Sequence, residues 1–176
     1  MDLSVVILSS PRLLLKPFGA GDAEEAWAAS TRTLTRFMGW VPAPSLEAYE
    51  LVWRSWQPML AAGTDVHFTV RIKTSGEFAG MAGLHDIAND EPEIGIWIKE
   101  ARHGLGFGAE AVAVAIRFAG ELGKPAVIYP VVEINTASRR LAERLGGVVV
   151  GSRNLRRASG EQFPEVVYRI PARRVD

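Results

Sequence analysis

The chain has 176 residues, of which 48% are hydrophobic and 23% are charged, values typical of a folded globular protein and not of a disordered or fibrous one. Lys plus Arg and Asp plus Glu both number 20, so no net charge draws the chain to nucleic acid or to an anionic membrane. The sequence has no cysteine, which excludes disulfides and thiolate chemistry and favours the cytoplasm. We therefore expect one cytoplasmic domain over residues 1–176 that binds a small ligand.

The first half of the chain predicts a strand, two helices and then an antiparallel meander. Residues 13–16 have a strand pattern, and Asp22 is a suitable N-cap for a helix over "AEEAWAAS". Ser45 is a suitable N-cap for a longer helix that reaches about Ala62 and carries Trp53, Trp56 and Leu60 on one apolar stripe. Short β-rich runs follow from residue 67, "HFTVRI", "FAGMAGLHDI" and "EIGIWI", separated by turn-forming segments.

The second half alternates helices with strands. A helix is predicted from about Gly108 to Leu122, followed by the strand "AVIYPVV" and a second helix over residues 136–145. The last two strands are "GVVVG" and "EVVYRI". The order of elements predicts a mixed α/β (α+β) fold in which the antiparallel part comes first.

The segment "EARHGLGFGAEA", residues 100–111, places three glycines directly before a helix. Gly104 to Ala109 satisfy the dinucleotide-binding pattern G-x-G-x-x-G/A, and Glu133 follows the next strand, so an NAD site is one alternative. Five residues separate the preceding strand from the first glycine, and that strand belongs to a meander, which argues against NAD. No Lys-Ser or Lys-Thr follows the glycines, which argues against a P-loop.

The stretch "PEIGIWIKEARHGLGFGAEAVAVAI", followed by "VVEINTASRRLAERLGG", resembles the GNAT superfamily of acyl-CoA N-acyltransferases. The resemblance is greatest to the branch of RimJ and RimL, the N-terminal acetyltransferases of ribosomal proteins, and it is close over residues 93–147. It implies a mostly antiparallel sheet of six to seven strands with about four helices and with splayed central strands. It also implies acetyl-CoA as co-substrate.

The resemblance assigns roles in acetyl-CoA binding to three segments. Unpaired backbone groups of Trp97, Ile98 and Lys99 would hold the pantetheine arm and the acetyl carbonyl. Asn135 would contact the pantetheine, and Ser138 would lie near the sulfur. Backbone N–H groups at a helix N-terminus would bind the pyrophosphate, as expected for an anion. The residues of this glycine loop are Arg102, His103, Gly104, Leu105, Gly106, Phe107 and Gly108. Ala101 departs from the Gln or Arg that the family prefers, and Gly147 departs from its Phe.

The implied reaction is direct acetyl transfer to a primary amine in a ternary complex. The acceptor is either a protein N-terminus or a small-molecule amine. Glu93 and His85 are the candidates for deprotonating it, and Ser138 would assist departure of the thiolate. The resemblance places Trp40 in the wall of the acceptor pocket. No covalent acyl-enzyme is expected, because the chain has neither cysteine nor a G-x-S-x-G motif.

Two further expectations concern ions and partners. The three histidines lack metal-ligand spacing, so no metal is expected. Family habit implies a homodimer, and no nucleic-acid or membrane partner is expected. The alternative to an enzyme is a non-catalytic acyl-CoA-binding module.

Overall fold

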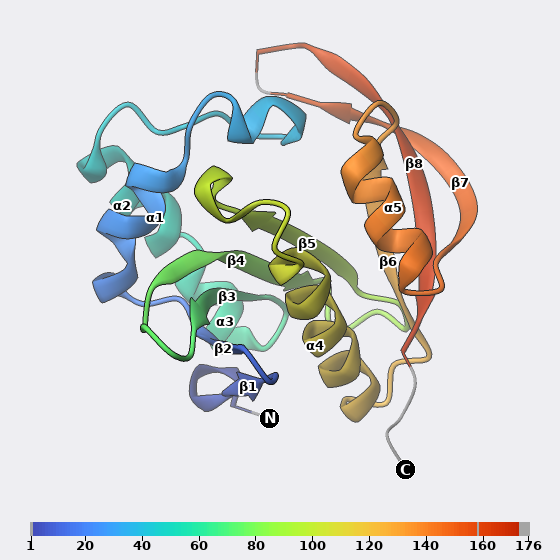
Figure 1. The fold of residues 1–176 in the computed structure, drawn as a ribbon, viewed down its shortest axis with the longest axis horizontal. Coiled ribbons are helices and arrows are strands. Elements are labelled where there is room, and N and C mark those ends of the chain that lie inside the picture. The colour runs from blue at the N-terminus through green and yellow to red at the C-terminus, as the bar shows by residue number, and fades with distance from the viewer. Residues whose placement is uncertain (1, 158, 173–176) are drawn as a thin grey trace.

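The computed structural model describes residues 2–157 and 159–172, and its strands form one eight-stranded sheet (Figure 1). The strand order is β1-β2-β3-β4-β5-β6-β8-β7, and all pairs are antiparallel except β5 with β6. The strands are β1 (Leu8–Ser9), β2 (Leu13–Pro17), β3 (Val66–Ile72), β4 (Phe78–His85), β5 (Glu93–Ile98), β6 (Ala126–Val132), β7 (Val148–Arg156) and β8 (Gln162–Pro171).

Five α-helices and four short 3₁₀ turns complete the described part of the chain. The helices are α1 (Ala23–Ala29), α2 (Leu46–Arg54), α3 (Gln57–Ala62), α4 (Phe107–Glu121) and α5 (Thr136–Arg144). The turns are η1 (Leu3–Val5), η2 (Ala20–Asp22), η3 (Leu34–Phe37) and η4 (Glu100–Arg102). The predicted mixed, mostly antiparallel fold is confirmed, with slightly more elements than the six to seven strands and about four helices expected.

One additional helix arises because the predicted long helix after Ser45 is broken. The Ser45 hydroxyl accepts a hydrogen bond from the Ala48 amide at 3.2 Å, so the predicted N-cap is confirmed. The helix ends at Arg54, since Pro58 has no N–H to donate to the Arg54 carbonyl four residues earlier. The prediction of a single apolar stripe is therefore wrong. Trp53 packs in a cluster with Phe18, whereas Leu60 packs against the main core.

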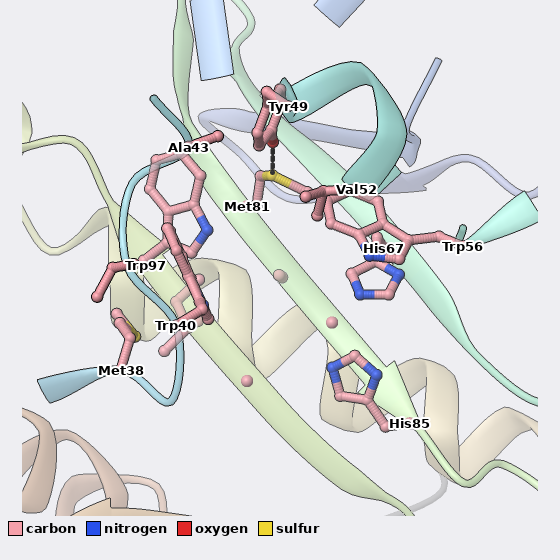
Figure 2. Close-up of a pocket in the computed structure, with 15 residues that line it drawn as sticks. Met38, Trp40, Ala43, Tyr49, Val52, Trp56, His67, Met81, His85 and Trp97 are labelled. Carbon is pink, nitrogen blue, oxygen red and sulfur yellow. Dashed lines mark hydrogen bonds between the residues drawn. The ribbon is translucent and has the colours of Figure 1, made fainter. Parts of the chain in front are cut away.

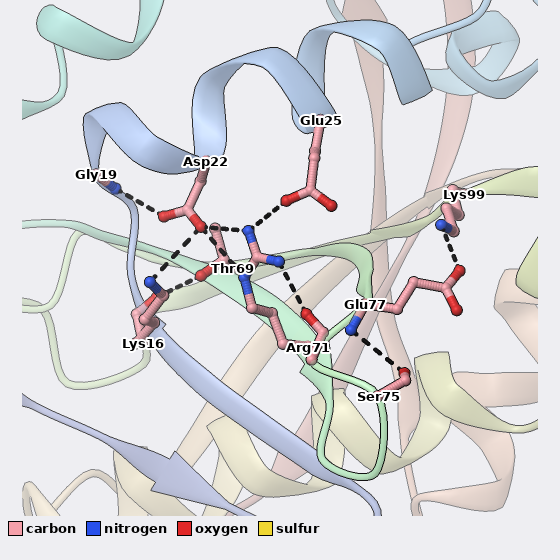
Figure 3. Close-up of polar contacts among 10 residues, drawn as sticks. Lys16, Gly19, Asp22, Glu25, Thr69, Arg71, Ser75, Glu77 and Lys99 are labelled. Atoms are coloured by element: carbon pink, nitrogen blue, oxygen red, sulfur yellow. Dashed lines mark hydrogen bonds and ion pairs between the residues drawn. The ribbon is translucent and has the colours of Figure 1, made fainter.

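Asp22 precedes α1 as predicted, but its carboxylate makes no capping bond to that helix. It accepts from the Gly19 amide at 3.1 Å and from the Arg71 guanidinium at 2.7 Å, and the Lys16 ammonium lies 3.7 Å away (Figure 3). The Asp22 side chain is 3% exposed, so this buried carboxylate depends on its partners. Arg71 also pairs with Glu25 at 2.6 Å, which ties α1 to β3.

Helices cover both faces of the sheet. The main core lies between α4 and the strands, where Phe68 of β3 meets Phe118 of α4 edge-on with 6.0 Å between ring centroids. A smaller cluster on the opposite face joins α1 and α2 to β4 through Phe78 and Met81. In β4, Ala82 and Leu84 belong to the main core and Met81 to the smaller cluster, as expected when side chains alternate across a strand. A register shift between Val70 and Arg71 of β3 breaks the alternation, so Phe78 lies on the same face as Met81.

The sheet opens between its two central parallel strands. β5 and β6 share one paired position, Glu93 with Ile128, where the Ile128 amide donates to the Pro92 carbonyl at 2.9 Å. Beyond it the strands diverge, and α4 begins beside the opening (Figure 1). The predicted splayed central strands are therefore confirmed.

Candidate active site

The β5 edge of the opening presents the backbone of two residues. The Lys99 amide donates to the Ala79 carbonyl of the β4 side at 2.8 Å, and hydrogen bonds alternate along an antiparallel strand. Lys99 and Trp97 therefore face β4, whereas Ile96 and Ile98 face the opening. The expectation that the backbone groups of Trp97 and Lys99 are unpaired is thus wrong. The backbone of Ile96 faces the opening instead. The register of the β4–β5 hairpin is the signal that identifies this residue.

The glycine loop leads from β5 into α4, and its amides are free from Gly104 onward. The amides of Arg102 and His103 donate to the carbonyls of Lys99 and Glu100, at 2.8 and 3.1 Å, so the prediction that these two amides bind the pyrophosphate is wrong. Gly104 and Gly106 have φ values of 74° and 79°, a left-handed conformation that favours glycine. Within the described residues, the amides of Gly104, Leu105 and Gly106 donate to no protein acceptor, and the first amides of α4 have none within the helix. A run of free N–H groups at a helix N-terminus is a site for an anion.

Arg12, which the sequence analysis did not single out, fixes this loop from the β1–β2 turn. Its guanidinium donates to the Leu105 carbonyl at 3.0 Å and pairs with Glu110 of α4 at 2.6 Å. It also lies over the Phe107 ring, 4.7 Å from the centroid. These contacts connect the loop to the first turn of α4, so the loop is preformed.

Glu77 holds the two cationic side chains predicted to lie near the co-substrate. Its carboxylate lies 2.6 Å from the Lys99 ammonium and 2.6 Å from the Arg102 guanidinium, and the Lys99 contact is visible in Figure 3. Hydrogen bonds from Arg102, and then from Lys99, lower the pKa of Glu77 to about 2. His103 is held as well, with its Nε2 atom 2.5 Å from the Ile98 carbonyl oxygen. Backbone groups are therefore the free donors of the loop.

Across the opening, Asn135 and Ser138 lie at the start of α5. The Asn135 side chain accepts from the Ser138 amide at 3.3 Å and so caps the N-terminus of that helix. The Ser138 hydroxyl lies 2.6 Å from the hydroxyl of Tyr129 on β6. Burial raises the pKa of Tyr129 to about 12, so this phenol stays protonated at neutral pH. Tyr129 is a second residue that the sequence analysis missed.

Gly147 follows α5 at a close backbone approach. A Cβ atom at this position would lie 2.8 Å from the Ala142 carbonyl oxygen and 3.1 Å from Ile170. An aromatic residue here would require the chain to move, so the family's Phe does not fit this backbone position. We find no contact that explains Ala101.

A cavity of about 420 Å³ lies on the α2 side of the sheet (Figure 2). Trp40 and Trp97 form one wall, with ring centroids 6.4 Å apart, and Trp56 stacks on His67 at 4.0 Å in the opposite wall. The cavity is lined by Met38, Trp40, Val41, Ala43, Tyr49, Val52, Trp56, His67, Met81, Ala82, Gly83, His85, Gly95, Ile96 and Trp97. Trp40, Trp97 and His85 are therefore brought together, and Ile96 belongs both to this lining and to the opening beyond β5.

His85 crosses the cavity floor. A Cβ on Gly83 would overlap its Nε2 atom, and one on Gly95 would lie 3.9 Å from it, so this cross-strand glycine pair gives the imidazole room. Its Nδ1 atom lies 3.1 Å from a carboxylate oxygen of Asp65. The His67 ring is 4.9 Å from that of His85. Burial, and then the proximity of His85, lower the pKa of His67 to about 4.

Glu93 is the cross-strand partner of His85, but its carboxylate is already engaged. Arg153 of β7 donates to both carboxylate oxygens, at 2.8 and 3.1 Å, and also donates to Glu165 at 2.8 Å. Hydrogen bonds to Glu93, more than those to Glu165, raise the pKa of Arg153 despite its partial burial. Of the two predicted bases, His85 is therefore the one with an unpaired nitrogen in the cavity.

The structure also bears on metals and membranes. Across residues 2–157 and 159–172, no group of three or more His, Asp or Glu side chains is placed to hold a metal ion. In the same described ranges, no helix has the length and apolar character needed to cross a bilayer.

Comparison with known proteins identifies the family. The pattern described as "Acetyltransferase (GNAT) domain" matches residues 12–148. A comparison with curated protein sequences gave no match.

Three solved structures share the fold. The GCN5-related N-acetyltransferase from Brucella melitensis has a TM-score of 0.81 at 21% identity, covering 98% of this chain and 81% of that one. Mycobacterium smegmatis RimJ in complex with CoA-disulfide has a TM-score of 0.78 at 18% identity, covering 91% and 82%. Spermidine N-acetyltransferase from Vibrio cholerae, in complex with CoA and spermine, has a TM-score of 0.78 at 18% identity, covering 93% and 97%. With the match of the domain over residues 12–148, these observations establish that the chain belongs to the GNAT acetyltransferase family.

Proposed function

We propose that this protein transfers the acetyl group of acetyl-CoA to a primary amine. The observation that carries the proposal is the run of free N–H groups in the glycine loop, beside the opening between β5 and β6 and with a cavity beyond β5. Two of the structural neighbours are complexes with CoA or its disulfide, which supports the same ligand here.

The residues present fit acetyl-CoA. Free amides from Gly104 to the first turn of α4 would receive the pyrophosphate, because they combine unpaired donors with the positive end of a helix dipole. The backbone of Ile96 and the amide of Ile98 would hold the pantetheine arm along β5, since the Ile98 carbonyl is engaged by His103. Asn135, at the start of α5, is proposed to contact the arm from the other side of the opening.

The acetyl group would then meet the amine at the edge of the cavity. The amine nitrogen attacks the thioester carbonyl carbon, so that a C–N bond forms and the C–S bond breaks. The proton leaving nitrogen passes to Nε2 of His85, and the thiolate of CoA takes up a proton on departure. Asp65 is a positioning residue in this scheme, because its carboxylate orients Nδ1 and so leaves Nε2 as the acceptor.

Ser138 is proposed to act at the sulfur. Its hydroxyl is paired with that of Tyr129, which stays protonated, so the pair has a proton to donate to the departing thiolate. A thiol has a pKa of about 8.5, and its thiolate departs without much assistance. The role of Ser138 is therefore auxiliary.

The experiment that tests the proposal measures ligand binding and turnover separately. CoA should raise the melting temperature, since a ligand that binds only the native state stabilises it, whereas NAD should not. Free thiol should then appear when acetyl-CoA and a primary amine are both supplied. Stabilisation by CoA without thiol release from any amine would indicate the non-catalytic binding module instead.

A further inference from the structure

The lining of the cavity beyond β5 disfavours a ligand with several positive charges. Of the residues that line it, all of them within the described part of the chain, none is Asp, Glu, Lys or Arg. The carboxylates nearest its floor are engaged, Asp65 with His85 and Glu93 with Arg153. A polycation entering this cavity would lose water and gain no ion pair, which is unfavourable.

Its shape suits a flat apolar group. The stacked pair of Trp56 and His67, with 10° between the ring planes, faces the edge-on pair of Trp40 and Trp97 across a floor that contains Gly83 and Gly95 (Figure 2). Because glycine has no side chain, the floor has room for the flat imidazole of His85 between the two aromatic walls. Aromatic walls favour aromatic and apolar ligands through area burial and edge-to-face contacts.

The wall that contains Trp40 is held in place by Arg157. This guanidinium donates to the carbonyl of Met38 at 2.8 Å and to that of Thr35 at 2.8 Å. The segment before Trp40 is therefore tied to the β7–β8 hairpin. Trp40 is 40% exposed, so its ring borders both the cavity and the solvent. A preformed wall of this kind reduces the entropy lost when a ligand binds.

We propose that the acceptor is a small primary amine whose amino group is carried on an aromatic or bulky apolar body, and not a polyamine. This inference rests on the proposed function, since the cavity is the acceptor site only if acetyl-CoA occupies the opening. The volume of about 420 Å³ lies toward the small end of the range for ligand pockets, roughly 300–1,000 Å³, which favours a small molecule over a peptide segment. Burial of the amine among apolar side chains would also lower its pKa, and that favours the neutral form that attacks.

The test compares thiol release with three acceptors at saturating acetyl-CoA: 2-phenylethylamine, spermidine and a hexapeptide that begins with serine. We expect kcat/KM for 2-phenylethylamine to exceed the other two by about tenfold or more, a ratio within reach of apolar pocket contacts. Trp40→Ala should lower kcat/KM for 2-phenylethylamine by about tenfold and leave the KM for acetyl-CoA within about twofold. A preference for spermidine or for the peptide would overturn the inference while leaving the proposed function intact.

A matched pair of variants tests the role of charge. Val52 lines the cavity and is 44% exposed, whereas Leu51, its neighbour on α2, is 73% exposed and does not line it. Val52→Glu should reduce the preference for 2-phenylethylamine over spermidine by about tenfold, since it adds a carboxylate that a polycation can pair with. Leu51→Glu adds the same charge outside the cavity and should leave the preference unchanged. Equal effects of the two substitutions would contradict the inference.

Calorimetry separates failure of the inference from failure of the proposed function. If no amine releases thiol, 2-phenylethylamine and spermidine are titrated into the CoA-loaded protein. Binding of 2-phenylethylamine alone would uphold the class of ligand and reject acetyl transfer. Absence of binding by 2-phenylethylamine, or tighter binding of spermidine, would reject the class of ligand as well.

Discussion

The carboxylate of Asp65 lies 3.1 Å from Nδ1 of His85 and so determines which imidazole nitrogen faces the cavity. An ionised carboxylate only accepts hydrogen bonds, so Nδ1 carries the proton and Nε2 carries the lone pair. The two residues are brought together by the β3–β4 register, in which Val66 lies opposite Leu84.

Asp65→Asn should therefore lower kcat without changing the KM for acetyl-CoA. An amide either donates to Nδ1 or accepts from it, and the preference for one tautomer is lost. We expect a decrease at or below the low end of the roughly 10²–10⁴-fold span of general base catalysis. Asp86→Asn is the matched control, because Asp86 is exposed and adjacent to His85 in sequence. Steady-state kinetics that show equal losses for the two substitutions would rule out the positioning role.

His85→Gln should lower turnover sharply. Glutamine has no basic nitrogen, so it cannot take up the proton that leaves the amine. We expect kcat to fall within the roughly 10²–10⁴-fold span of general base catalysis, with the KM for acetyl-CoA nearly unchanged. His67→Gln is the control, because it retains His85 and its ring lies 4.9 Å from that of His85. Equal losses for the two substitutions in steady-state kinetics would assign the base elsewhere.

His67 should make the fold less stable in mild acid. Its pKa is lowered from 6.5 to about 4, mainly by burial, so between these pH values the unfolded chain binds a proton that the folded chain does not. The free energy of unfolding should fall as pH is lowered across this window, by at most about 3 kcal/mol. Urea midpoints at about pH 7 and about pH 5 measure the loss, which should be smaller in His67→Gln. Identical losses would exclude His67 as the source.

Substitutions of Asn135 and Ser138 should change different kinetic parameters. Ser138→Ala should lower kcat modestly and leave the KM for acetyl-CoA nearly unchanged, because a thiolate departs readily without an acid. Asn135→Ala should raise that KM, since a contact made in both ground and transition states contributes uniform binding. The same substitution removes a helix cap worth about 1 kcal/mol, so its melting temperature is measured first. The reverse pattern would mean that the two roles are exchanged.

Arg71→Ala should destabilise the fold far more than Arg54→Ala. Removal of Arg71 leaves the Asp22 carboxylate buried, with the nearest remaining cation 3.7 Å away on Lys16. Loss of one partner from a buried ion pair costs about 3–5 kcal/mol, whereas an exposed pair is worth about 0–1 kcal/mol. Arg54 of α2 pairs with Glu50 of the same helix, both side chains are exposed, and Arg54 is therefore the control. Denaturant unfolding that gives similar values for both variants would contradict this account of Asp22.

The sequence was informative wherever the signal is local. Ser45 and Asn135 are helix caps that accept from amides three residues ahead, and the glycine loop lies directly before α4, so each could be predicted from adjacent residues. The same local reasoning missed the break at Pro58, because the spacing of Trp53, Trp56 and Leu60 fits one helix even though the backbone cannot continue it.

Pairings between distant residues could not be predicted in this way. The loop is fixed by Arg12 through Glu110, 98 residues away, and Glu93 is engaged by Arg153, 60 residues away. Each depends on the three-dimensional arrangement of the sheet, which periodicity does not specify. The partner of His85 depends on strand register, where a shift of one residue would place Asp65 on the other face. Homodimerisation and a cytoplasmic location stay predictions.

The central claim, acetyl transfer to an amine, is tested most directly by mass spectrometry of the acceptor after incubation with acetyl-CoA. The account predicts that 2-phenylethylamine gains the mass of one acetyl group, in amounts equal to the thiol released and dependent on His85. Thiol release without an acetylated amine, or no acetylated product from any primary amine although CoA binds, would contradict it.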